Sequence, residues 1–192
     1  MRPLTRYAIA ACAMMLFFVW ADRSGAQQDK SKRPSPPGTA TFSFADGETI
    51  TIDYSRPKIR SPKTGEPRVI YGALVPYGEV WRAGANEATT FITQASLDLG
   101  GTPVPAGSYT LYILPEQSGP WKLIVSKKTG QWGIPYPGEQ YDLARIDLKT
   151  DKTPSTVQQY TISFDKRGPN AGMLNFDWEN TRASVDFTEA NK

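Results

Sequence analysis

The residues of this chain that are best suited to chemistry lie in one short segment, residues 81–90. Within it, Trp81-Arg82 and Asn86-Glu87 bring together a large aromatic surface, a forked cation, an amide and a carboxylate. Arginine can hold a carboxylate or a phosphate through two parallel hydrogen bonds, and tryptophan can stack on a sugar ring or a cation. The segment is therefore a candidate ligand-binding loop, called the 81–90 loop below.

Four other residues have the same chemical character and would line the same cleft: Tyr54, Arg56, Gln131 and Trp132. The last two belong to a segment rich in glycine, proline and tyrosine, residues 130–141. Loops of this composition often carry the binding function of a β-sandwich. Gly84, inside the 81–90 loop, would let another part of the backbone approach closely.

The same loop also fits a purely structural interpretation. Arg82 and Glu87 would form an ion pair that fixes the loop, and Asn86 would cap a turn. Trp81 and Trp132 would then fill gaps in the core. At this point both interpretations stay open.

The composition excludes the commonest catalytic groups. The chain has no histidine, and its single cysteine, Cys12, lies in a segment that we expect to be removed. Ser-His-Asp and Cys-His arrangements and histidine-ligated metal sites are therefore excluded, and we expect no catalytic residue, metal or cofactor. The remaining enzymatic option is a pair of carboxylates in a glycan hydrolase, in which Glu87 would work with Glu79, Asp53 or Glu179.

The N-terminus predicts export. Two arginines, Arg2 and Arg6, precede an uncharged, mostly apolar run at residues 7–20, which is shorter than the roughly 20 residues of a membrane-spanning helix. Small residues at positions 24–26 suit a cleavage site. We expect residues 1–26 to be a signal peptide and the protein to be periplasmic or secreted. The alternatives are an uncleaved N-terminal anchor and a lipid attached at Cys12.

Charge and composition set the rest of the organisation. The chain has 22 Lys+Arg residues, of which three lie in residues 1–26, and 19 Asp+Glu residues, of which one lies there. The remaining chain therefore has 19 basic and 18 acidic residues and a net charge of +1. This balance argues against nucleic acid or an anionic membrane surface as the main partner. Residues 27–38 are polar and rich in proline, which predicts a flexible spacer. Residues 39–190 are expected to form one domain, with no stable membrane span.

Alternating apolar and polar residues predict an all-β domain. Ten runs carry strand signals, most of them with full or partial alternation: residues 39–45, 48–54, 89–95, 96–99, 108–114, 121–126, 141–149, 157–164, 173–178 and 183–187. Asp46-Gly47 and Gly100-Gly101 predict tight turns, and residues 179–181 predict a third. These features indicate a single antiparallel β-sandwich, or flattened barrel, of about ten strands. One short helix or 3-10 turn would fit at residues 84–88, a stretch too short to be assigned from its pattern.

Trp121 and Trp178 are in phase with core positions, which predicts that both pack inside. The run at residues 108–114 is apolar on both faces and predicts a central strand that is covered on both sides.

Several motifs of rare residues follow one another along the chain. They are LVPYG at 74–78, VWR at 80–82, GANEATT at 84–90, PAG at 105–107, QWG at 131–133, and Trp178-Glu179 before Thr181. In order and spacing, the set resembles an uncharacterised bacterial family, domain of unknown function 2911. The resemblance implies an exported bacterial protein with a single β-rich domain, and it assigns no activity, cofactor or residue role.

The leading hypothesis is a non-enzymatic exported module that binds a small molecule, a glycan or an envelope partner through the 81–90 loop. One alternative is a carboxylate-dependent glycan hydrolase. The other is a purely structural envelope protein, in which the loop has no ligand.

Overall fold

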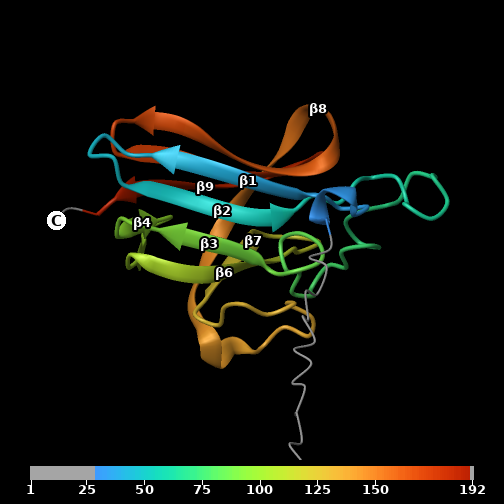
Figure 1. Cartoon of the computed structure of the whole chain (residues 1–192), viewed down its shortest axis with the longest axis horizontal. Helices are drawn as coiled ribbons and strands as arrows, with labels where there is room; N and C mark the ends of the chain where they lie inside the picture. Colours follow the sequence, from blue (N-terminus) through green and yellow to red (C-terminus); the bar gives the residue numbers. More distant parts are fainter. Residues whose placement is uncertain (1–28, 191–192) are drawn as a thin grey trace, which may run out of the picture.

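The computed structural model describes residues 29–190, and its strands form one antiparallel sheet (Figure 1). The strands are β1 (Pro37–Ser43), β2 (Thr49–Ser55), β3 (Thr89–Thr93), β4 (Leu97–Leu99), β5 (Thr102–Val104), β6 (Gly107–Leu114), β7 (Trp121–Ser126), β8 (Asp142–Gly168) and β9 (Ala171–Glu189). Their order in the sheet is β1-β2-β3-β6-β7-β8-β9-β4-β5. The all-β prediction is confirmed, because the only helical elements in this range are two 3-10 turns, η1 (Lys30–Lys32) and η2 (Glu139–Tyr141).

The expected signal peptide, its cleavage site and Cys12 lie outside the described residues. Among residues 29–190, no helix has the length and apolarity that crossing a membrane would require.

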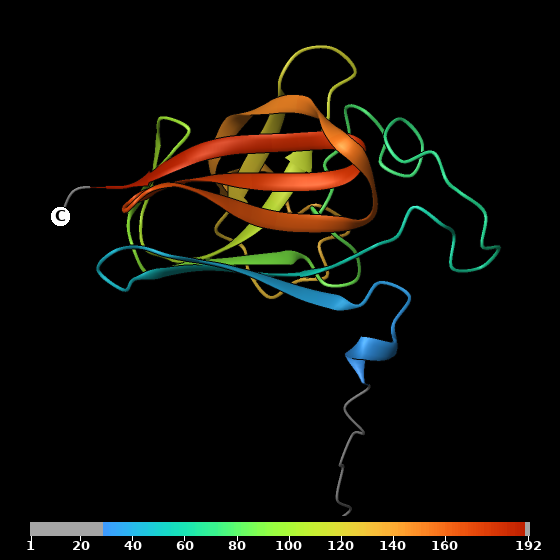
Figure 2. The ribbon, with the colours of Figure 1, turned by 90° about the horizontal axis from the view of Figure 1, so that it is seen from above.

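The sheet folds over itself because β8 belongs to both of its halves. The first residues of β8 pair with β7, and residues from 149 onward pair with β9. Figure 2 shows β8 and β9 lying over β1, β2 and β3, so that the two halves face each other. The apolar faces meet between them, where the Phe42 ring contacts Phe164 and Phe187 at centroid distances of 5.7 and 4.9 Å.

The structure has nine strands where ten were expected, because β8 and β9 each join two of the expected runs and one further strand, β5, is present. The runs at 141–149 and 157–164 are parts of one strand, as are the runs at 173–178 and 183–187, while β5 was not predicted. The predicted hairpin at 179–181 is wrong, since the chain continues through it inside β9. Glu179 has a φ of 55° there, and shifts in the β8–β9 register absorb the irregular residues.

The turn predictions at Asp46-Gly47 and Gly100-Gly101 are confirmed. Gly47 and Gly100-Gly101 have positive φ and connect β1 to β2 and β4 to β5. Strand β6 is buried on both faces, as predicted. On one face Leu111 joins the main core, and on the other Tyr112 meets Tyr136 of the β7–β8 connection with ring centroids 5.1 Å apart.

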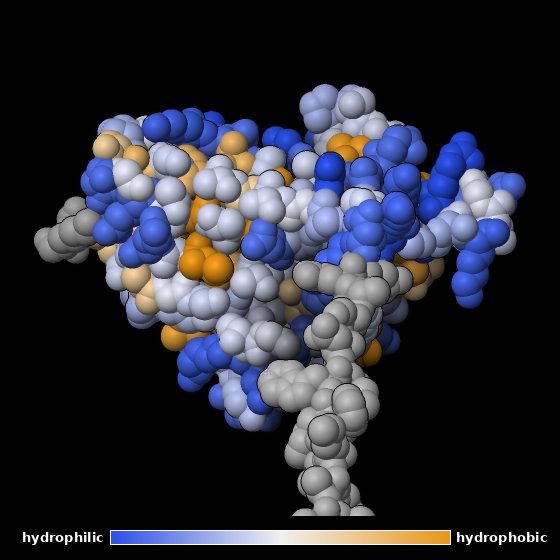
Figure 3. Space-filling model, in the orientation of Figure 1, coloured by the Kyte–Doolittle hydropathy of each residue, from blue (hydrophilic) through white to orange (hydrophobic). Residues whose placement is uncertain are grey.

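The two longest connections leave the sheet at the same end. Asp53, Thr90, Thr110 and Ser126 pair in one row across β2, β3, β6 and β7. The β2–β3 connection (residues 56–88) and the β7–β8 connection (residues 127–141) both begin just beyond this row. On the face seen in Figure 3, hydrophilic side chains dominate this end of the molecule, with smaller apolar areas between them.

Part of the expected spacer also lies at this end. Residues 29–36, called the strap below, carry η1 and lead directly into β1, which begins at Pro37. The Arg56 backbone N–H donates to the Pro36 carbonyl at 2.9 Å, which joins the end of the strap to the end of β2.

Candidate functional site

Two hollows lie on opposite sides of the 81–90 loop. The first, called the strap pocket, has a volume of about 300 Å³ and is lined by Lys30, Arg33, Pro37, Asp53, Tyr54, Ser55, Glu87, Ala88, Thr90, Gly130 and Gln131. The second, called the basic groove, has a volume of about 600 Å³ and is lined by Pro34, Ser35, Pro57, Lys58, Arg60, Ser61, Pro62, Arg68, Leu74, Val75, Trp81, Arg82, Gly84, Ala85, Ile134 and Trp178. Of the predicted site residues, Tyr54, Glu87 and Gln131 line the strap pocket and Trp81 and Arg82 line the basic groove. The other three, Arg56, Asn86 and Trp132, line neither hollow.

The 81–90 loop is held by backbone and side-chain hydrogen bonds. Trp81 exchanges two backbone hydrogen bonds of 2.8 Å with Ile113 in β6, and its indole N–H donates to the Gly84 carbonyl at 3.0 Å. The buried Thr89 hydroxyl donates to the Ala83 carbonyl at 2.8 Å. These bonds fix the loop without any contribution from its charged residues.

Left-handed backbone at two positions excludes the helical turn that the sequence allowed at residues 84–88. Ala83 and Asn86 have φ values of 50° and 56°. Asparagine tolerates this region, whereas alanine in it costs roughly 1–2 kcal/mol. Between them, a Cβ on Gly84 would lie 3.1 Å from the Ser55 carbonyl oxygen, so the expected close backbone approach at this glycine is confirmed.

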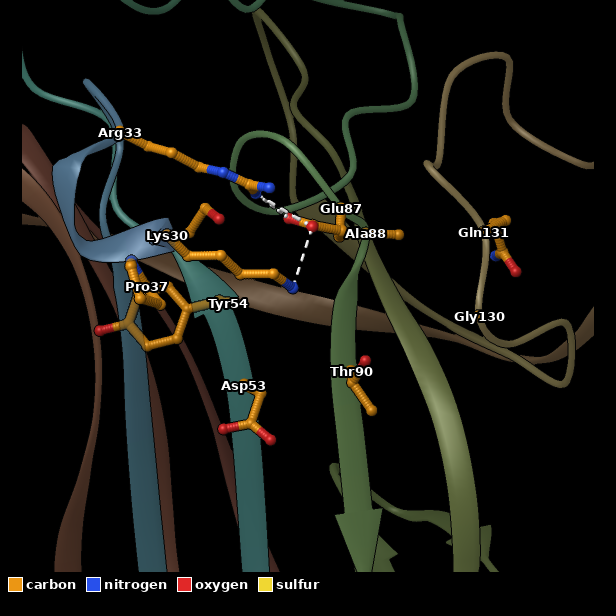
Figure 4. A pocket seen from close by; sticks show the side chains of 11 residues that line it. Lys30, Arg33, Pro37, Asp53, Tyr54, Glu87, Ala88, Thr90, Gly130 and Gln131 are labelled. Atoms are coloured by element: carbon orange, nitrogen blue, oxygen red, sulfur yellow. Dashed lines mark hydrogen bonds and ion pairs between the residues drawn. The ribbon is translucent and has the colours of Figure 1, made fainter. Parts of the chain in front are cut away.

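Glu87 takes its partners from the strap, so the expected ion pair between Arg82 and Glu87 is wrong. The Arg33 Nη1 donates to both carboxylate oxygens, at 3.0 and 2.9 Å, and the Lys30 Nζ lies 3.1 Å from Oε1 (Figure 4). Burial would raise the pKa of Glu87, but hydrogen bonds from its own backbone N–H, Arg33 and Lys30 outweigh it and lower the pKa to about 2.

Arg82 faces the other hollow and binds the β7–β8 connection. Its Nη1 donates to the Trp132 carbonyl at 3.1 Å, and its guanidinium lies over the Trp132 ring, 5.4 Å from the centroid. Trp132 is 52% exposed, so it does not fill the core as the structural interpretation expected. Arg82 is half-buried, and this burial lowers the pKa of its guanidinium.

Three other predicted residues have structural partners. The buried Tyr54 hydroxyl accepts from the Ile162 backbone N–H at 2.9 Å, and Arg56 donates to the Thr161 hydroxyl at 3.0 Å. The Asn86 amide donates to the Ser35 carbonyl in the strap at 3.0 Å. Tyr54 and Arg56 thus tie β2 to β8, and Asn86 ties the loop to the strap.

Gln131 is held rigidly at the edge of the strap pocket. Its Nε2 donates to the Tyr112 hydroxyl at 2.8 Å and to the Lys128 carbonyl at 2.9 Å. Its backbone carbonyl accepts from the Ala88 N–H at 3.2 Å, which fixes the β7–β8 connection over the 81–90 loop.

The basic groove has an aromatic floor. Trp81 stacks on Trp178 with ring centroids 5.7 Å apart and planes 22° apart, and it meets Tyr160 edge-on at 5.0 Å. Trp178 is 1% exposed and Trp121 is 6% exposed, so the predicted packing of both residues is confirmed. Trp81 is half-buried and belongs to both the floor and the groove wall.

The charges of the basic groove all have one sign. Its lining contains Lys58, Arg60, Arg68 and Arg82 and no carboxylate. The arginines donate to backbone carbonyls, Arg60 to Gly65 at 2.9 Å and Arg68 to Ile59 at 3.1 Å. Within residues 29–190, no ion pair joins any of these four cations to an acidic side chain.

Comparison with protein-family models matches residues 35–187 to the family described as "Protein of unknown function (DUF2911)". The chain belongs to this family. The match spans the sheet except the last two residues of β9, together with both connections that line the hollows. It confirms the resemblance carried by the sequence motifs. Searches of curated proteins and of solved structures found no match.

In this DUF2911 chain, Arg82 was the one lining cation of the two hollows that the sequence predicted, and Lys30, Arg33, Lys58, Arg60 and Arg68 escaped prediction. Lys30 and Arg33 fall in the segment expected to be a spacer, and their partner lies more than 50 residues away in sequence. Arg56, Lys58 and Arg60 alternate with other residues in an extended segment that contains no acid, and this was a local signal for the groove. Arg68 carried no such signal.

A group of carboxylates lies at the opposite end of β2. Oxygen atoms of Asp46, Glu48 and Glu189 come within 4.8 Å of one another. Oxygen-only sets of this kind suit calcium or magnesium, although exposed acidic groups often gather without an ion. Asp46 also accepts from the Glu48 backbone N–H at 3.0 Å and so stabilises the β1–β2 turn.

Proposed function

We propose that this chain is a non-enzymatic binding module and that its ligand is an acidic small molecule or glycan held in the basic groove beside the 81–90 loop. The observation that carries the proposal is the set of four groove cations without a lining carboxylate, next to two tryptophans. The volume of about 600 Å³ lies within the range of small-molecule sites, roughly 300–1,000 Å³.

The four cations of the basic groove have no carboxylate in the groove lining to compensate their charge. Four like charges around one hollow repel one another, and hydrogen bonds to neutral carbonyls offset only part of this repulsion. An anionic ligand would remove the repulsion and form charge-assisted hydrogen bonds with the guanidinium groups. Arg82 is the strongest candidate contact, because it is already partly desolvated.

Aromatic and apolar side chains in the groove support a ligand with a ring or a hydrocarbon body. Trp81 borders the groove together with Leu74, Val75 and Ile134, and the exposed Trp132 lies beside Arg82. Tryptophan faces stack well on sugar rings, and charged groups on the same ring can reach the surrounding arginines.

The hydrolase alternative has less support. Glu87 and Asp53 line the same pocket, whereas Glu79 and Glu179 line neither hollow. A carboxyl group with a pKa of about 2 is ionised near neutral pH, so Glu87 cannot supply the general acid that glycoside cleavage needs. No contact in the described part of the chain favours a purely structural envelope role over binding.

The test compares an oligomer of galacturonic acid with its neutral methyl ester, using titration calorimetry. We expect the acid to bind and the ester to bind at least about tenfold more weakly, because esterification removes the charge that the arginines recognise. Affinity for the acid should also fall as salt concentration rises. Equal binding of acid and ester would contradict the proposal.

Matched variants locate the site. Arg82→Gln and Arg60→Gln should each weaken binding of the acid about tenfold. Arg167→Gln is the control, because Arg167 is an exposed cation near the β8–β9 turn, at the other end of the sheet. If the control loses as much affinity as the groove variants, the binding is non-specific attraction to cations and the proposal fails.

A further inference from the structure

We propose that the strap pocket is a second binding site, for a guanidinium or ammonium group, and that Arg33 of the strap occupies this site in the structure. The proposal is independent of the basic groove, since it concerns the opposite side of the 81–90 loop and a ligand of opposite charge.

The contact between Arg33 and Glu87 is a charge-assisted pair that is partly withdrawn from water. One guanidinium nitrogen donates to both carboxylate oxygens, and the Arg33 side chain is only 19% exposed. Lys30 adds a second cation at 3.1 Å. Figure 4 shows both side chains extending from the strap toward Glu87. The carboxylate of the 81–90 loop is thus saturated by groups from one separate segment.

The strap itself is held almost entirely by polar contacts. None of residues 29–36 is buried, and η1 contributes no buried side chain. Besides the Glu87 contacts, the strap is joined to the body by the Ser35 carbonyl, which accepts from Asn86, and by the Pro36 carbonyl, which accepts from Arg56. Segments with so little apolar burial open at low free-energy cost, so an external group can compete for their place.

The pocket without the strap is acidic. Both of its lining cations, Lys30 and Arg33, belong to the strap, whereas its carboxylates, Asp53 and Glu87, belong to the body. Asp53 is exposed and accepts a hydrogen bond of 2.6 Å from the Thr39 hydroxyl. When the strap leaves, two carboxylates remain beside a hollow lined by hydroxyl and amide groups, and this is the setting that recognises a cation.

Room for a ligand exists even while the strap is in place. About 300 Å³ remains open between Glu87, Asp53 and Gln131, bordered by Thr90 on β3. Thr90 pairs directly with Asp53 across β2 and β3, so the hydroxyl and the carboxylate lie side by side on the sheet. An arginine or amine side chain from a peptide, or a free amine of similar size, fits this combination of charge and volume.

The experiment uses the full chain with Arg33→Ala and two matched probes, Nα-acetyl-arginine amide and Nα-acetyl-citrulline amide. The probes have nearly the same shape and differ in the charge of the terminal group. We expect the variant to bind the arginine probe about two- to fivefold more tightly than the unsubstituted chain does, because its own competing guanidinium is gone. We expect the citrulline probe to bind at least tenfold more weakly than the arginine probe.

Further variants make the result decisive. Adding Glu87→Gln to Arg33→Ala should abolish the gain, and Arg33→Gln should reproduce it, which provides a second background if the alanine variant unfolds. Thermal unfolding of each protein shows that it is folded. The proposal is overturned if Arg33 variants bind the arginine probe no better than the unsubstituted chain, if citrulline binds equally well, or if the Glu87→Gln substitution has no effect.

Discussion

The charged side chains of the 81–90 loop have oppositely charged partners in the strap pocket but none in the lining of the basic groove. On the strap side, Glu87 meets Arg33 and Lys30, and the charges of the pocket compensate one another. On the groove side, Arg82 and its neighbouring cations meet only carbonyl oxygens and an aromatic ring. The difference shows that two oppositely charged residues five positions apart, Arg82 and Glu87, need not form an ion pair. Here each one belongs to a separate surface.

The two hollows also differ in how deeply the side chains that support them are buried. The groove rests on a buried aromatic cluster of Trp81, Tyr160 and Trp178, whereas the strap pocket is closed by half-exposed ion pairs. Burial of large rings stabilises a fold by several kcal/mol, while exposed ion pairs contribute about 0–1 kcal/mol. The groove is therefore the rigid half of the site, and the strap pocket is the half that can open.

Truncating Trp178, in the aromatic floor of the groove, should have the largest effect on stability. Trp178→Ala deletes a fully buried ring that contacts Trp81, Tyr160 and Tyr71, and we expect it to cost about 3–5 kcal/mol in the free energy of unfolding. Urea denaturation measures this change. A loss below about 1 kcal/mol would mean that the cluster does not support the loop, and the contrast in depth would then be wrong.

Gly133 tests how closely the β7–β8 connection must approach the loop. A Cβ there would lie 2.8 Å from the Ala88 Cβ, and φ is +85°. Gly133→Ala should therefore cost about 1–3 kcal/mol. The matched control is Gly130→Ala, which has φ of +74° but no atom within 4 Å of a new Cβ, so it should cost less. Equal losses in thermal stability would show that only the backbone conformation matters.

Acid should weaken the contact between the strap and Glu87. The pKa of Glu87 in the fold, about 2, is below its ordinary value of 4.5. Its stabilising contribution is therefore complete above about pH 4.5 and is lost as the pH falls toward 2. We expect the unsubstituted chain to exceed Glu87→Gln in thermal midpoint at pH 6, and this difference to shrink steadily as the pH falls from about 4.5 toward 2. A difference that is constant over this range would contradict the assignment.

Double-mutant cycles measure the smallest effect and address the comparison most directly. Coupling between Arg33 and Glu87 should reach about 0.3–1 kcal/mol, as expected for a partly exposed pair. Coupling between Arg82 and Glu87 should be smaller than this, because Arg82 bonds to Trp132 instead. A larger coupling for Arg82 than for Arg33 would restore the ion pair that the sequence suggested.

Much of the fold was already determined by local sequence. Alternation in runs such as residues 48–54 specifies strands, because Ile50, Ile52 and Tyr54 must share one face to be buried together. Gly47 and Gly100 mark turns, since they adopt positive φ without steric cost. The phase of Trp121 and Trp178 placed them inside for the same reason. All these features depend on neighbours within a few residues.

The tertiary structure alone decided the partners of the 81–90 loop. Left-handed backbone at Ala83 and Asn86 turns the chain so that Arg82 and Glu87 line different hollows, although they are close in sequence. Folding then brings Arg33 to Glu87 across more than 50 residues. Local patterns carry no information about which distant charge arrives, because that depends on how β1 and β3 flank β2 and where the strap leaves the sheet.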